Sequence, residues 1–260
     1  MTRFKLRDIG LAALLFVACN STPTPPPTTD NAPLVLVPAG EFTMGSAVLP
    51  NEKPVHTVNL DAFWIDQYEV SNALYQKCVE AQACPPPVEG YTDQHPDGYF
   101  TNPQYSNFPM AHVNWSDADR YCHWAGKRLP TEAEWEKAAR GTDARSFPWG
   151  TAFDPKRVNS AYNLDLVTVA VDSYPDGVSP YGAFNLSGNV WEWTADWYDE
   201  DYYTASPRDN PTGPLTGTLK TLRGGGYGVF DAAMRTSLRR DMDPVTSVPY
   251  IGFRCARSAQ

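Results

Sequence analysis

Proline and glycine recur along almost the whole chain and limit how much regular structure it can form. The 260 residues include 24 Pro and 18 Gly, which interrupt helices and strands and favour turns. They also include 8 Trp, 14 Tyr and 11 Phe, whose side chains supply large buried contacts where regular strands are scarce. We therefore expect a loop-rich α+β domain rather than a helical bundle, and the length suffices for one substantial core.

The N-terminus has the order of a bacterial export signal. Residues 1–8 are basic and residues 9–18 form an apolar run that is too short to span a bilayer. Ala18 directly before Cys19 resembles a lipobox, which implies cleavage before Cys19 and acylation of its thiol. An ordinary cleaved signal, with Cys19 incidental, is the alternative. Asn20 rather than Asp follows the cysteine, which favours the outer membrane in a host with two membranes.

This interpretation divides the chain into three parts. We expect a lipoprotein signal peptide over residues 1–18, a Pro/Thr-rich tether over 19–32 and one domain over 33–260. The protein would be exported and lipid-anchored to the cell envelope. The formal net charge is −9, and no Lys/Arg cluster follows the first residues. Because phosphate contacts need a basic patch, we expect no nucleic-acid partner.

Local patterns predict three helices and several short strands. A Ser71 N-cap precedes one helix, Ser116 with Asp119 begins a second, and Thr131 with Glu134 forms a capping box for a third. The second and third helices should end at Gly126 and Gly141. Strands are expected at 34–37, 41–45, 56–60, 63–65, 222–229, 234–239 and 250–257. Between Gly141 and Gly188 the chain should be mostly irregular.

Several sequence blocks occur in a fixed order that identifies a family. The most specific are GKRLPTEAEWE at 126–136 and GNVWEW at 188–193. The others include PAGEFTMG at 38–45, DQYEVSN at 66–72, VNWSDA at 113–118, LRGG at 222–225 and GFRC at 252–255. Together they resemble the sulfatase-modifying-factor family, the domain of the formylglycine-generating enzyme, over essentially the whole domain. The resemblance implies a compact α+β fold of the C-type-lectin-like kind.

The cysteines are expected to be structural rather than catalytic. With Cys19 acylated, four remain in an oxidising compartment, where two disulfides are the default. The resemblance implies that Cys122 pairs with Cys255, which leaves Cys78 and Cys84 for each other. A catalytic or metal role for Cys78 and Cys84 is the alternative.

The family's oxidase holds copper(I) with two cysteines shortly after the RGG block, because soft thiolates suit that ion. The matching positions here are Val229 and Met234, with Gly226 and Phe230 replacing a serine and a histidine. We therefore expect no catalytic cysteines and no copper.

The resemblance also implies calcium. One site would use side-chain and carbonyl oxygens, which suit a hard cation, from Asn185, Gly188, Val190 and Glu192. A second would begin at Asn159 and Ser160. The alternative is that these residues only hydrogen-bond their own loops.

Three functions follow from the sequence. The first is a binding or scaffold lipoprotein that recognises an envelope protein, peptide or glycan. The second is an oxidoreductase of the family that acts on a small metabolite. The third, formylglycine generation, is opposed by the missing thiols. Candidate polar groups of a groove after the RGG block, with solvated surface charge as the alternative, are Trp191, Asp231, Arg235, Arg239 and Arg240.

Overall fold

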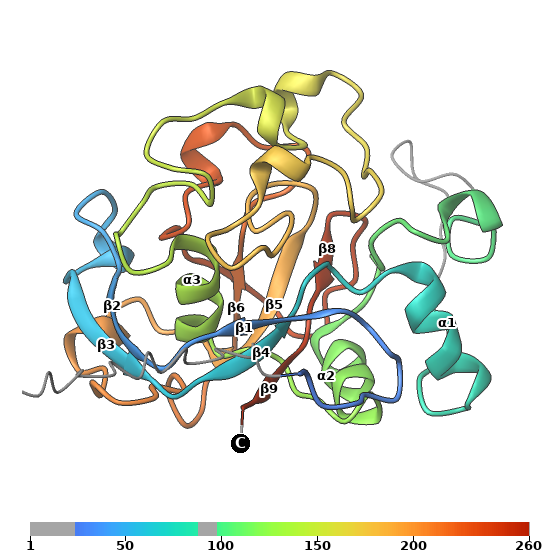
Figure 1. Cartoon of the computed structure of the whole chain (residues 1–260), viewed down its shortest axis with the longest axis horizontal. Coiled ribbons are helices and arrows are strands. Elements are labelled where there is room, and N and C mark those ends of the chain that lie inside the picture. Colours follow the sequence, from blue (N-terminus) through green and yellow to red (C-terminus); the bar gives the residue numbers. More distant parts are fainter. Residues whose placement is uncertain (1–23, 88–97, 260) are drawn as a thin grey trace, which may run out of the picture.

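Three α-helices and three small sheets organise residues 24–87 and 98–259, the parts of the chain that this computed structural model describes (Figure 1). The α-helices are α1 (Asn72–Glu80), α2 (Trp115–Trp124) and α3 (Glu132–Arg140). Short 3-10 helices lie at Pro50–Glu52, Pro103–Tyr105, Pro155–Arg157, Ala161–Asn163, Pro175–Gly177, Tyr202–Thr204 and Asp231–Ala233. Loops make up most of the rest, so the expected loop-rich α+β class is confirmed.

The sheets are mainly antiparallel. One has the order β1 (Leu34–Val37), β4 (Phe63–Asp66) and β9 (Ala256–Ser258). A hairpin pairs β2 (Gly40–Met44) with β3 (His56–Leu60). The largest has the order β7 (Arg240–Met242), β6 (Lys220–Arg223), β5 (Trp191–Trp197) and β8 (Ile251–Phe253). In Figure 1 the first sheet crosses the lower half of the molecule, and the C-terminus lies at its lower edge.

The central strand β5 was not predicted. It pairs antiparallel with β6 and parallel with β8, with Trp191 opposite Ile251. Its first four residues are all buried although polar and apolar side chains alternate along the strand, WEWTADW. This alternation is a strand signal, and it was overlooked because the tryptophans were interpreted as buried anchors.

The helix caps are those predicted from the sequence, except that one helix begins at a different residue. The Thr131–Glu134 capping box is present, and α3 ends at Gly141, whose φ is 66°. The Ser71 hydroxyl accepts from the Leu74 amide at the start of α1. Helix α2, however, begins earlier than Ser116, because the Asn114 side chain accepts from the backbone of Asp117 at 3.0 Å.

The expected strands after residue 222 are only partly present. The chain leaves β6 at Gly224, whose φ of 95° favours glycine and turns the backbone. The segment 234–239, expected as a strand, forms none, because its backbone turns where the Leu238 amide donates to the Arg235 carbonyl at 3.0 Å. The final segment splits into β8 and β9, which belong to different sheets.

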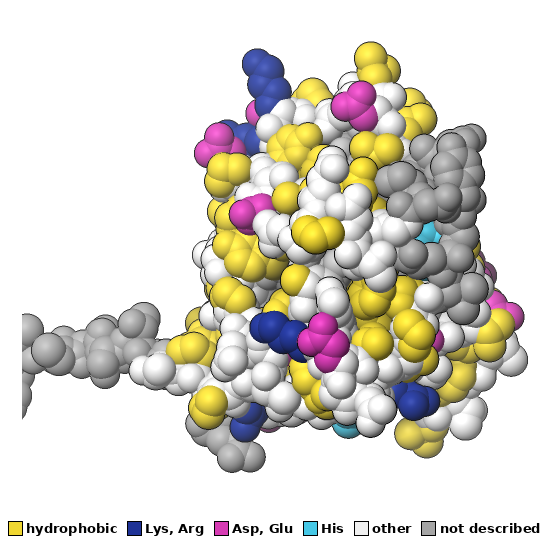
Figure 2. Space-filling model, turned by 90° about the vertical axis from the view of Figure 1, so that its right-hand side faces the viewer, with side chains coloured by type: hydrophobic (Ala, Val, Ile, Leu, Met, Phe, Trp, Pro, Cys, Tyr) yellow, Lys and Arg dark blue, Asp and Glu magenta, His cyan; other side chains and the backbone are white. Residues whose placement is uncertain are grey.

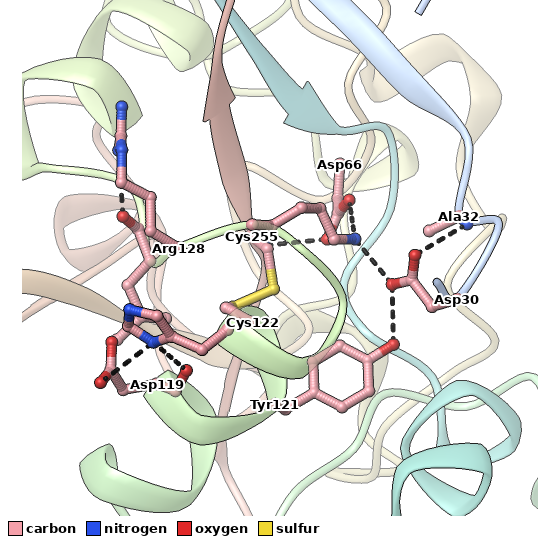
Figure 3. The surroundings of a disulfide bond; sticks show 11 residues. Asp30, Ala32, Asp66, Asp119, Tyr121, Cys122, Arg128 and Cys255 are labelled. Carbon is pink, nitrogen blue, oxygen red and sulfur yellow. Dashed lines mark hydrogen bonds and ion pairs between the residues drawn. A yellow bond between two sulfur atoms is a disulfide. The ribbon is translucent and has the colours of Figure 1, made fainter. Parts of the chain in front are cut away.

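The domain begins earlier than residue 33. Asp30 is fully buried, and one of its carboxylate oxygens accepts from the Tyr121 hydroxyl at 2.9 Å and from Lys127 Nζ at 2.7 Å (Figure 3). Lys127 also binds Asp66 at 2.7 Å. This buried cluster ties the end of the expected tether to α2 and β4. The signal peptide over 1–18 and Cys19 lie outside the described residues.

Both disulfides form as expected. Cys122 and Cys255 join α2 to the segment between β8 and β9, with their Cα atoms 5.6 Å apart (Figure 3). Cys78 and Cys84 close a short loop after α1, with Cα atoms 5.3 Å apart. All four cysteines are buried in one apolar cluster with Tyr75 and other aromatic side chains.

The surface carries scattered charge on the side seen in Figure 2, where Lys and Arg side chains stand singly rather than as a patch. Hydrophobic side chains are spread between them. Within the described ranges, no helix has the length and apolarity that crossing a membrane requires.

Candidate functional site

Two irregular segments meet in the upper part of Figure 1. One runs from α3 to β5, and the other follows β6. The Gly188 amide donates to the Gly224 carbonyl at 2.9 Å, and the Asn189 amide donates to the Asn159 carbonyl at 3.0 Å. The first bond joins the GNVWEW block to the RGG block, and the second joins the GNVWEW block to the segment after α3.

The two positions to which the family resemblance assigns copper thiolates are apolar and packed. Met234 is fully buried beside Phe147 and Val158, and the partly buried Val229 packs against the same cluster. The four cysteines among the described residues are all joined in disulfides. The residues present therefore do not fit copper(I), which prefers thiolate ligands.

Buried ion pairs fix the segment after β6 to α3. Arg223 of the RGG block binds Glu132 at 3.0 Å and Glu136 at 2.6 Å. Arg239 binds Glu132 from the other side, with Nε 2.7 Å from Oε1. Burial alone would raise the pKa of Glu132, but Arg239 and Arg223 hold it below its ordinary value. Such charge-assisted bonds set the geometry of the segment.

The structure does not bring all the expected groove residues together. Arg239 is 3% exposed and serves the ion-pair network. Arg235 forms a bidentate ion pair with Glu52, in which Nη2 and Nη1 lie 2.6 and 2.7 Å from the two carboxylate oxygens. Asp231 accepts from the Tyr162 hydroxyl at 3.1 Å on the surface. Trp191, by contrast, lies on a pocket wall.

That pocket has a volume of about 220 Å³ and adjoins the copper-equivalent position Val229. Its walls include Trp191, Tyr227, Tyr250 and Arg240. The Arg240 guanidinium lies 5.3 Å from the centre of the Trp191 ring. Sequence reasoning named Arg240 but missed both tyrosines, although each stands two residues from a family block.

Larger pockets elsewhere have charged side chains that are already paired within the protein. One of about 650 Å³ lies beside Lys127 and Arg128, and another of about 520 Å³ includes Arg128 and Glu134. Lys127 is already bound by two carboxylates, Asp30 and Asp66, and Arg128 by Glu134 at 2.6 Å. Their charges are therefore used within the fold.

The first expected calcium set lies at the start of β5. Asn185 and Asn189 have positive φ values of 53° and 60°, and this curled loop leads into the strand that carries Glu192. The Asn185 amide nitrogen donates to Glu69 at 2.9 Å. In the described part of the chain, no hydrogen bond falls on the Asn185 side-chain oxygen or on the Gly188 carbonyl.

Two buried acidic side chains and one buried arginine lie beside this loop. Glu192 accepts from Arg254 at 2.7 Å through both oxygens and from the Trp135 indole at 2.8 Å. Glu69 is a second buried carboxylate nearby, and burial followed by the charge of Glu192 raises its pKa to about 8. Glu192 is paired with Arg254, and a carboxyl group with the pKa of Glu69 carries little charge at neutral pH. The Asn185 side-chain oxygen and the Gly188 carbonyl are donors of the kind that calcium prefers. Glu69 was not foreseen, although it lies in the DQYEVSN block.

The second expected set is already used by its own loop. The Asn159 amide nitrogen donates to the Val167 carbonyl at 2.8 Å and to the Asn189 side-chain oxygen at 3.1 Å. The Ser160 carbonyl accepts from the Asn163 amide at 2.9 Å. In residues 24–87 and 98–259, no group of three or more His, Cys, Asp or Glu side chains is placed to hold a metal ion.

Comparison with known proteins agrees with the sequence blocks. Residues 20–259 match the sulfatase-modifying factor enzyme 1-like domain. The chain is 37% identical to the formylglycine-generating enzyme of Streptomyces coelicolor, over 86% of this chain and 89% of that one. It is 31% identical to the hercynine oxygenase of Mycolicibacterium smegmatis, over 85% of this chain and 60% of that one.

A solved structure supports the same assignment. PvdO from Pseudomonas aeruginosa superposes with a TM-score of 0.76 and 28% identity, covering 92% of this chain and all of that one. The fold, the ordered sequence blocks and the sequence identity all indicate the same family. The chain belongs to the sulfatase-modifying factor enzyme 1-like domain family.

Proposed function

We propose that this chain is a binding member of its family, anchored to the cell envelope through a lipid on Cys19, and that it does not generate formylglycine. One observation carries the proposal. Val229 and Met234 occupy the positions of the copper thiolates, and Met234 is buried in an apolar cluster. Without thiolates, the copper(I) chemistry of the family has no ligands here.

The remaining site suits recognition. The segment after β6 is fixed to α3 by buried ion pairs through Arg223 and Arg239. A rigid wall lowers the entropic cost of binding, because little has to be ordered when a ligand arrives. The pocket beside Val229 lies on this wall, which supports a role in binding a partner molecule.

A peptide assay tests the loss of oxidase activity. The full chain, supplied with copper(I) and oxygen, is incubated with a Cys-x-Pro-x-Arg peptide, and the peptide mass is followed. The Streptomyces coelicolor enzyme serves as the positive control. We expect an unchanged mass for this chain. Conversion of the cysteine to formylglycine would refute the proposal.

Labelling tests the anchor. Cells that express the full chain are fed a labelled fatty acid, and the label should appear on the protein. A Cys19→Ala variant should remain unlabelled. Label on the variant, or none on the wild type, would contradict lipidation at Cys19.

A second candidate is an oxidoreductase that acts on a small molecule. The 31% identity to a hercynine oxygenase favours it. Oxygen consumption with hercynine and a thiol, measured beside the Mycolicibacterium smegmatis enzyme, tests this candidate. Uptake by this chain above the rate without substrate would favour it over the binding role.

We also propose a structural calcium ion on the loop before β5. Asn185 and Glu192 would hold it with side-chain oxygens, and Gly188 and Val190 with carbonyls. Among the described residues, no hydrogen bond falls on the Asn185 side-chain oxygen or on the Gly188 carbonyl, which supports this because such oxygens suit a hard cation.

A further inference from the structure

The pocket beside Val229 is built where one end of the largest sheet meets the segment after β6. Trp191 is the first residue of β5, Arg240 is the first of β7, and Tyr250 directly precedes β8. Tyr227 comes from the turn after β6. Strand ends position these side chains more firmly than a free loop would, and preorganised walls favour binding.

Arg240 differs from its neighbours in having no acidic partner. Arg235 is bound to Glu52 and Arg239 to Glu132. Arg240 is exposed, and within residues 24–87 and 98–259 no carboxylate lies at ion-pair distance from it. Its charge is therefore available to a ligand.

The position of Arg240 over Trp191 defines what it can bind. The guanidinium carbon lies 5.3 Å from the ring centre. A guanidinium held against an aromatic face keeps its in-plane N–H groups free for two parallel hydrogen bonds. Carboxylates match that fork geometry.

The other walls are aromatic and carry donors. Tyr227 is 4% exposed, and burial together with the nearby Tyr250 raises its pKa to about 12. The Tyr227 hydroxyl therefore stays protonated at neutral pH. Among the described residues, neither the Tyr227 nor the Tyr250 hydroxyl takes part in a hydrogen bond that fixes it elsewhere.

Glycine at position 226 keeps the pocket open. A Cβ atom there would lie 3.3 Å from Trp191 Cδ1, which is too close without a shift of the indole. The sequence has glycine here where the active oxidases of the family have serine. The access to the Trp191 edge is therefore a property of this chain.

We propose that the pocket binds a carboxylate attached to a flat, apolar group, with Arg240 holding the carboxylate and the aromatic side chains of Trp191, Tyr227 and Tyr250 packing on the flat group. The proposal rests on the binding role above and names its ligand class. The volume of about 220 Å³ lies below the usual range for drug-sized ligands, roughly 300–1,000 Å³. The ligand is thus a small aromatic acid or the C-terminal aromatic residue of a peptide.

The rest of the chain does not attract anions. Its formal net charge is −9, so binding of an acid to this protein must come from a local cationic group rather than from the overall field. Loss of the Arg240 charge should therefore remove most of the affinity.

Isothermal titration calorimetry on the full chain tests the ligand class. The probes are indole-3-acetate with indole-3-acetamide as its uncharged match, and Gly-Gly-Trp with its C-terminal amide. We expect one or both acids to bind, and each binding acid to exceed its amide by at least about tenfold, as expected for a charge-assisted pair. Which acid binds identifies the source. Absence of binding by both acids, or equal binding of acid and amide, would overturn the proposal.

Variants locate the site. Arg240→Gln should weaken acid binding by at least about tenfold, and Gly226→Ala should weaken it by crowding Trp191. Arg120→Gln, an exposed arginine on α2 away from the pocket, is the matched control and should bind like the wild type. Thermal melts check that each variant is folded. Wild-type affinity in folded Arg240→Gln would refute the assignment.

Different results would refute the binding role and the ligand class. Formylglycine formation in the peptide assay would refute the binding role without touching the calorimetry. Absence of acid binding by a chain that also leaves the peptide unchanged would refute only the ligand class.

Discussion

Removal of each disulfide in turn shows how much of its contribution to the free energy of unfolding comes from the length of the loop that it closes and how much from local packing. The Cys122–Cys255 bridge spans 133 residues of sequence and the Cys78–Cys84 bridge spans 6. In the chain-entropy model, a cross-link stabilises the fold by restricting the unfolded chain, and the effect grows with the logarithm of loop length. That model gives about 5 kcal/mol for the long loop and about 2 kcal/mol for the short one.

The pairs are well matched in other respects. All four cysteines belong to the same buried apolar cluster, and three of them are fully buried while Cys84 is 6% exposed. Replacement of either pair by alanine therefore removes similar packing contacts, each with its own cost. The difference between the variants, about 3 kcal/mol, then reports the loop.

Urea denaturation of the wild type, Cys122→Ala/Cys255→Ala and Cys78→Ala/Cys84→Ala under non-reducing conditions measures this difference. The free energy of unfolding comes from linear extrapolation, and the slope with urea shows whether the unfolded chain expands. Because whole domains are stable by only about 5–15 kcal/mol, the long-bridge variant should be close to unfolding at 37 °C. The reasoning fails if removal of the short bridge costs as much as removal of the long one.

Three further perturbations follow from the buried charges. Asp30→Ala leaves Lys127 with one carboxylate partner and should lower the free energy of unfolding by about 3 kcal/mol; an unchanged urea midpoint would show that the residue-30 contact contributes nothing. Burial and the nearby Glu132 raise the pKa of Asp196 to about 8, so this group makes the protein less stable as pH rises from about 4 to about 8. Asp196→Asn should remove that slope and add at least about 1 kcal/mol at pH 8, as urea titrations at pH 5 and pH 8 would reveal; a wild-type slope would contradict it. Calcium at a hundredfold excess over its Kd should stabilise the chain by about 2.7 kcal/mol, a gain lost with a chelator or in Asn185→Ala, whereas a melting temperature insensitive to calcium would exclude the site.

Local signals in the sequence were sufficient for several elements. The Thr131–Glu134 capping box and the terminal Gly141 fix α3 with bonds that span only a few residues. The strand at 34–37 also follows from its own residues. The caps of α3 are satisfied within a few residues, so distant contacts do not alter them. The strand at 34–37 pairs with the distant strand β4, but its own β-branched and apolar residues already favour an extended backbone.

Other elements depended on burial that local patterns do not reveal. The alternation in WEWTADW is a local strand signal, but it does not reveal that the polar residues Glu192 and Thr194 on the second face of β5 are buried as well. Asp30 was assigned to a tether by its Pro/Thr-rich surroundings. Its position was set instead by Lys127, 97 residues away in sequence, because a buried ammonium needs carboxylate partners.

The sequence by itself determined the family, the α+β class and the absence of thiols at positions 229 and 234, since each follows from residue identity and order. The tertiary structure decided which arginine is available for a ligand. Arg239 is bound by a carboxylate 107 residues away and Arg235 by one 183 residues away, while Arg240 has none among the described residues. Identical side chains close together in sequence thus acquire different roles, because the charge that each one meets is set by long-range packing.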